Sequence, residues 1–101
     1  MKYNKLVRDK IPEIIKNNGD TAFTHIADEE EYREKLRKKL QEEVDEFLAE
    51  PNNEELADIL EVIYALGEID GVNAEELDEI RRAKTEKRGG FKDRIILDET
   101  N

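Results

Sequence analysis

Two pairs of acidic residues stand at positions where an amphipathic helix would carry apolar side chains. The first pair, Glu43 and Glu46, lies in "KKLQEEVDEFL" (38–48), and the second, Glu55 and Asp58, lies in "NEELADILEV" (53–62). An isolated ionised carboxylate in a protein core is so costly that it normally takes up a proton, and neighbouring carboxylates aggravate that cost. These acids therefore need either a basic partner or a divalent cation.

The angular positions of the four acids separate them from ordinary surface glutamates. At roughly 100° per residue, Glu43 falls inside the apolar stripe of its helix, and Glu46 lies at the edge of that stripe. Glu55 falls within the broad apolar arc of the next helix, and Asp58 lies at its margin. The first stripe consists of Leu36, Leu40, Val44 and Phe47, and the second arc of Leu56, Ile59, Leu60, Val62, Ile63 and Leu66. Two such pairs, each spaced i,i+3 on successive antiparallel helices, can face each other across a bundle.

Other acids of the same segments have a simpler interpretation. Asp45 points away from the apolar stripe. Together with three other acids it fits a solvated helix face supported by i,i+4 pairs with lysine and arginine. The residues that fit this interpretation on spacing alone are Glu42, Asp45, Glu54 and Glu61.

The predicted ligand atoms are all oxygens, because the chain has no cysteine and His25 is its single histidine. All-oxygen ligation suits Mg²⁺, with Mn²⁺ as the alternative, and such ions typically share substrate phosphates. We interpret His25 as a structural residue rather than a ligand. Catalysis by a histidine-dependent triad is correspondingly disfavoured.

A basic stretch follows in the third predicted long helix, after an acidic first half. This segregation complements the helix dipole, which explains part of it without any function. Lys84 and Arg88 nevertheless continue the spacing of Leu77 and Ile80, which places them on the prolongation of the buried side. Two cations one turn apart suit polyphosphate oxygens.

Helix caps predict the elements that must position these residues. Asp28 caps a helix that runs to about Glu50, before Pro51, and Asn53 caps a second that ends between residues 67 and 71. Asn73, with Glu76 three residues on, opens a third helix that runs to Gly89–Gly90.

The ends of the chain carry weaker signals. Pro12 suits the first turn of a short helix through about Asn18, and Thr21–Ile26 alternates like a short extended segment. We expect the tail "FKDRIIL" (91–97) to pack back onto the helices as an extended segment.

Composition completes the prediction of a single all-α domain over residues 1–101. The chain is 44% charged and 37% hydrophobic, which favours an antiparallel helical bundle with short extended terminal segments. Its net charge of −10 argues against a nucleic acid polymer as partner. The sequence contains neither a membrane-length apolar run nor a signal-type apolar core, so we expect a cytoplasmic protein.

The motifs resemble a known enzyme family. "KLQEEVDEF", "EELADILEVIYAL" and "KTEKRGGF" are similar to the MazG-type all-α nucleoside triphosphate pyrophosphohydrolases, whose signature is E-E-x-x-E followed by E-x-x-D. "KLVRDKIPEII" resembles a small single-domain branch of that superfamily, described as similar to phosphoribosyl-ATP pyrophosphohydrolase.

The resemblance implies roles for individual residues. It places the metal on Glu43, Glu46, Glu55 and Asp58, catalysis on Glu42 and Glu43, and substrate binding on Lys39, Lys84 and Arg88. The implied reaction is Mg²⁺-dependent cleavage of a nucleotide between its α and β phosphates, and the implied assembly is a homodimer, sometimes paired into a dimer of dimers. Phosphoribosyl-ATP hydrolysis in histidine biosynthesis and a non-catalytic helical interaction module stay open as alternatives.

Overall fold

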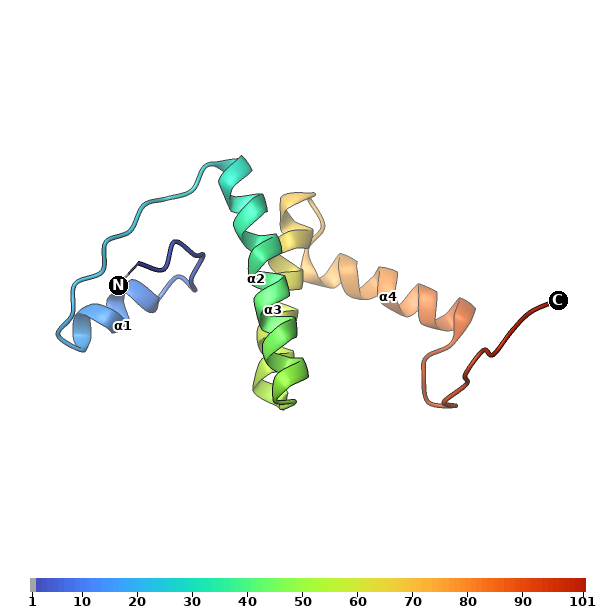
Figure 1. Ribbon diagram of the computed structural model, residues 1–101. Coiled ribbons are helices and arrows are strands. Elements are labelled where there is room, and N and C mark those ends of the chain that lie inside the picture. Colours follow the sequence, from blue (N-terminus) through green and yellow to red (C-terminus); the bar gives the residue numbers. More distant parts are fainter. Residues whose placement is uncertain (1) are drawn as a thin grey trace.

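Residues 2–101, which the computed structural model describes, contain four α-helices and no β-strand (Figure 1). The helices are α1 (Ile11–Asn17), α2 (Glu29–Ala49), α3 (Asn53–Ile69) and α4 (Ala74–Arg88). The prediction of an all-α protein is confirmed for this part of the chain. Within it, no helix combines the length and the apolar composition that crossing a membrane requires.

Each long helix begins at a capping side chain. The side chains of Asp28, Asn52 and Asn73 each accept a hydrogen bond from the backbone N–H three residues on, at 2.8–2.9 Å. The prediction that Asn53 caps α3 is wrong by one residue. Asn52 has the extended backbone (φ −157°, ψ 165°) that lets its amide oxygen reach the N–H of Glu55, whereas Asn53 is already helical.

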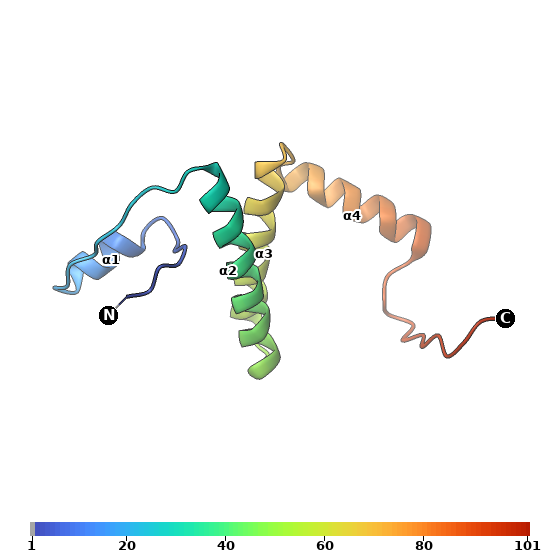
Figure 2. The same cartoon turned by 45° about the horizontal axis from the view of Figure 1, so that its top comes forward.

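Helices α2 and α3 lie antiparallel and side by side in both views (Figures 1 and 2). Only three residues, 50–52, connect them, and a connection this short favours antiparallel neighbours. Leu36 on α2 and Val62 on α3 are the buried apolar residues of the described chain, at 2% and 7% exposure. The core therefore lies between these two helices.

Helix α4 packs against the end of α3 and then extends away from it (Figure 1). The turn is tight: a Cβ added at Gly67 would lie 3.0 Å from the carbonyl oxygen of Val72. The described chain measures 60 × 32 × 24 Å with a radius of gyration of 17.8 Å, against about 13 Å for a compact domain of this length. Within one copy, residues 2–101 do not close into a bundle.

Two segments outside the helices leave their apolar side chains in solvent. Residues 21–26 form no strand, and Phe23 and Ile26 are almost fully exposed. The prediction that the tail packs back is wrong, since Phe91 and Ile95 are also exposed. Because α4 carries the tail away from α2 and α3 (Figure 2), its apolar side chains have no helix surface to cover.

Candidate metal centre

Three acids from two helices converge at one end of the α2–α3 pair. Glu43 of α2 and Glu55 and Asp58 of α3 each place one carboxylate oxygen within 4.8 Å of the other two. Asn52 fixes where α3 begins and therefore the angular positions of Glu55 and Asp58. The antiparallel pairing then sets both residues against the C-terminal part of α2, where Glu43 lies. We call Glu43, Glu55 and Asp58 the acidic cluster.

Glu43 is the buried charged residue of the described chain, at 7% exposure. Its Oε2 atom and the Oε2 atom of Glu55 are buried without a hydrogen-bond partner in residues 2–101. Buried polar atoms in native structures almost always have a partner, and an ionised one left alone is especially costly. The cluster thus has the burial, the charge and the free oxygen atoms that fit a divalent cation.

The pKa of Glu55 also reflects the crowding of carboxyl groups in the cluster. A hydrogen bond with Glu43, partial burial, and the charges of Glu46, Glu43 and Asp58 together raise the pKa of Glu55 to about 7. Such a hydrogen bond requires a proton on one of the two carboxyl groups, because two carboxylates only accept. When both groups are ionised, their Oε2 atoms have no donor. A proton or a cation must fill that position.

Basic side chains surround the cluster and balance part of its charge. Lys39 lies 3.4 Å from Glu43 Oε1 and 3.7 Å from Glu42. Lys5 Nζ donates to Glu42 Oε1 at 3.1 Å, and this hydrogen bond raises the pKa of Lys5. Arg8 donates to Asp58 Oδ1. None of these contacts reaches the Oε2 atom of Glu43.

A pocket of about 450 Å³ lies between the N-terminal segment and the α2–α3 pair. Its lining includes Glu43 and Asp58 of the cluster together with three cations, Arg8, Lys10 and Lys39. A pocket of this size is in the range of small-molecule sites. Its mixture of carboxylates and cations suits a metal ion together with an anionic ligand.

The structure brings together some of the predicted site residues and separates others. Glu42 and Lys39 lie at the cluster, whereas Glu46 is exposed and lies outside the group of three, although its charge still acts on Glu55. Lys84 and Arg88 are exposed on the half of α4 that extends away from α2 and α3 (Figure 1).

Lys5 and Arg8 are neighbours of the cluster that the sequence patterns did not single out. They belong to "KLVRDKIPEII" (5–15), where they stand outside any periodic helix. The available signal was that the two basic residues flank apolar Leu6 and Val7. It could not indicate which acids they would face.

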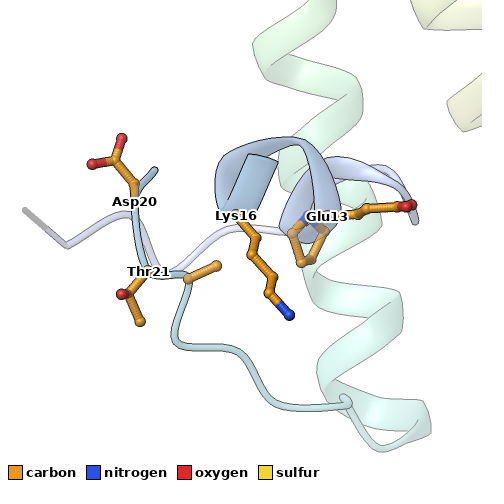
Figure 3. Close-up of a pocket in the computed structure, with 6 residues that line it drawn as sticks. Glu13, Lys16, Asp20 and Thr21 are labelled. Atoms are coloured by element: carbon orange, nitrogen blue, oxygen red, sulfur yellow. The ribbon is translucent and has the colours of Figure 1, made fainter. Parts of the chain in front are cut away.

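A second pocket, of about 490 Å³, lies on α1 and the segment after it (Figure 3). Figure 3 shows Glu13 and Lys16 extending from α1, with Asp20 and Thr21 on the following segment. In residues 2–101, α1 packs against none of the other three helices. This pocket is therefore separate from the acidic cluster.

No protein-family model, curated protein or solved structure matches this chain. The family resemblance of the sequence motifs stays a prediction. The acidic cluster and its surroundings are the features of this chain that point to a function.

Proposed function

We propose that this protein is a Mg²⁺-dependent nucleotide pyrophosphohydrolase, which cleaves a nucleoside triphosphate or related nucleotide between the α and β phosphates. The observation that carries the proposal is the buried Oε2 atom of Glu43, which has no hydrogen-bond partner in the described residues and lies beside Glu55 and Asp58. A purely structural acid would be expected to have a donor there.

Glu43, Glu55 and Asp58 would hold the ion, with Mn²⁺ as the alternative, and Glu46 would join them from its exposed position at the edge. Bound Mg²⁺ supplies neutralisation of phosphate charge and activation of water. Lys39 lies at the rim of the cluster, where its ammonium can bind a phosphate oxygen.

Glu42 is suited to accept the proton of the attacking water, because it lies beside the cluster without belonging to it. Water adds to phosphorus, the bond from phosphorus to the bridging oxygen breaks, and pyrophosphate leaves with the electron pair of that bond. The products are the monophosphate and pyrophosphate. Glu43 would act both in metal binding and in catalysis.

The homodimer implied by the sequence is part of the proposal. Leu56 and Leu60 of α3 and Ile80 of α4 are about half exposed, and Leu48 of α2 is more so. Together with the open shape of one copy, this exposed apolar surface is typical of a chain that packs against another protein surface. A second copy, and further a dimer of dimers, would cover it. Sedimentation at micromolar concentration should give at least twice 11.8 kDa, and a stable monomer would contradict the dimer.

A dimer also bears on Lys84 and Arg88. Because α4 extends away from the cluster of its own chain, these cations can serve as substrate-binding residues only at the cluster of a second copy. We therefore propose that Lys84 and Arg88 bind the substrate at the cluster of a second copy.

Pyrophosphate release from a panel of nucleotides tests the activity. The panel contains canonical, deoxy and damaged nucleoside triphosphates and phosphoribosyl-ATP, each assayed with and without Mg²⁺. We expect Mg²⁺-dependent release from at least one of them and its loss in Glu43→Gln. Asp45→Asn is the matched control, since Asp45 is an exposed acid of α2 that accepts from Gln41.

Two outcomes would redirect the proposal. Release from phosphoribosyl-ATP alone would identify the enzyme of histidine biosynthesis. Absence of release, together with a melting temperature that Mg²⁺ leaves unchanged, would support the non-catalytic helical module.

A further inference from the structure

We propose that Arg8 is a phosphate-binding residue of this site, held on Asp58 until a divalent cation takes that carboxylate. The phosphate part of this inference rests on the proposed function. It adds the N-terminal segment, residues 4–10, to α4 as an element that binds the phosphate groups of the substrate.

The N-terminal segment makes two further contacts with α2 that do not involve Arg8. Lys35 Nζ donates to the backbone carbonyl of Asn4 at 2.8 Å, and Lys5 Nζ donates to Glu42 Oε1 at 3.1 Å. Asn4 has φ 49°, a left-handed conformation that asparagine adopts more readily than most residues. Neither contact involves Arg8, so both stay available to the segment when Arg8 leaves Asp58.

The contact of Arg8 with Asp58 is of the kind that a metal ion can replace. The two side chains are 55% and 35% exposed, and ion pairs so open to water contribute little stability. A divalent cation at Asp58 would at the same time meet Glu43 and Glu55, whose Oε2 atoms have no hydrogen-bond partner in residues 2–101. Three carboxylates, Glu43, Glu55 and Asp58, would hold such a cation, whereas the guanidinium pairs with Asp58 alone. Metal binding should therefore release Arg8.

The released guanidinium would stay at the pocket of about 450 Å³ that it already lines with Lys10 and Lys39. This pocket also contains Glu43 and Asp58, so a ligand bound there meets the metal and the cations together. A planar guanidinium can bind two phosphate oxygens at once, which an ammonium cannot. Arg8 therefore has the chemistry and the position to bind a polyphosphate chain once Asp58 is occupied.

Two binding measurements on the full chain test the exchange, because it predicts changes of opposite sign. Calorimetry gives the Kd of Mg²⁺ alone and then of inorganic pyrophosphate at saturating Mg²⁺. In Arg8→Ala we expect Mg²⁺ to bind about two- to fivefold more tightly, since a weak competitor has been removed. We expect pyrophosphate to bind about tenfold more weakly, as for loss of a charge-assisted hydrogen bond.

Lys16→Ala is the matched control, because it removes one positive charge from α1, which packs against neither α2 nor α3. It should leave both Kd values within about twofold of wild type, because Lys16 is exposed and does not line the pocket of the acidic cluster. Arg8→Lys should recover part of the pyrophosphate affinity. Circular dichroism checks that each variant is folded.

Weaker Mg²⁺ binding in Arg8→Ala, or unchanged pyrophosphate binding, would overturn the inference. If the wild-type protein hydrolyses a nucleotide in that case, the proposed function stands without Arg8. If the wild-type protein does not bind Mg²⁺ at all, both fall.

Discussion

The α2–α3 pair and helix α4 are both rich in charged residues but differ in what those charges face. Glu43 lies between two packed helices and is almost fully buried, whereas every residue from 79 to the end of the chain is exposed. In the first region the carboxyl groups lie close together, and the hydrogen bond with Glu43, partial burial and the neighbouring charges raise the pKa of Glu55 to about 7. In the second, the ion pairs of Asp78 with Arg81 and Arg82 lie in water and are weak. Helical position gives a charge unusual chemistry only where a second element covers it.

Removal of the buried charge should have the largest effect. Glu43→Gln or Asp58→Asn should lower turnover by more than about 100-fold, beyond the loss usual for groups that only support metal ligands. Without Mg²⁺ the same variants should melt at an equal or higher temperature, because a repelling charge has been removed. Turnover assays and thermal melts provide the two measurements. A variant that melts lower and keeps its activity would show that these acids are structural.

The basic half of α4 provides the second test. Lys84→Ala and Arg88→Ala should each weaken transition-state stabilisation by about 2–4 kcal/mol, as for loss of one preorganised charge-stabilising group. Arg82→Ala and Lys87→Ala, on the other side of the helix, should change turnover little. Equal losses of turnover in all four variants would mean that the basic residues of α4 act only through their combined electrostatic field.

Mixed dimers determine which cluster these cations serve. Equal amounts of Glu43→Gln and Arg88→Ala protein, unfolded and refolded together, should regain about a quarter of wild-type activity, because half of the dimers are mixed and each has one intact site. No recovery would show that Arg88 does not act across the dimer.

The next largest effect should be on the pH dependence of stability, which distinguishes the acidic cluster from the exposed charges of α4. The folded-state pKa of Glu55 is raised from 4.5 to about 7, so between these values the folded protein holds a proton that the unfolded chain has lost. Without Mg²⁺, stability should therefore fall as pH rises through that window, and Glu55→Gln should flatten the fall.

Thermal melts from pH 4.5 to pH 8, with EDTA or with Mg²⁺, measure this effect. Mg²⁺ should stabilise the protein increasingly as pH rises, because it replaces the proton. Glu54→Gln, an exposed acid in the same turn of α3, is the control and should keep the wild-type slope. An unchanged slope in Glu55→Gln would contradict the raised pKa.

The smallest effects should come from the two asparagine caps. Asn52→Ala and Asn73→Ala should each lower the free energy of unfolding by about 1 kcal/mol. Only Asn52→Ala should also weaken Mg²⁺ binding, because it frees the turn of α3 that holds Glu55. Denaturant titrations and calorimetry give both quantities. Equal Mg²⁺ affinity in the two variants would mean that the cap does not position the cluster.

The sequence by itself determined the helices and the identity of the acids. Side-chain caps and the 3.6-residue period are local properties, so the long helices were predicted to within a few residues, and Glu43 and Glu55 stood out as wrongly placed for solvent. Tertiary structure decided what these acids face. Arg8 meets Asp58 across 50 residues of sequence, and a periodic pattern contains no information on such a contact. The direction of α4, which exposes Lys84 and Arg88, likewise depends on the turn at Gly67–Val72, where two backbones approach closely.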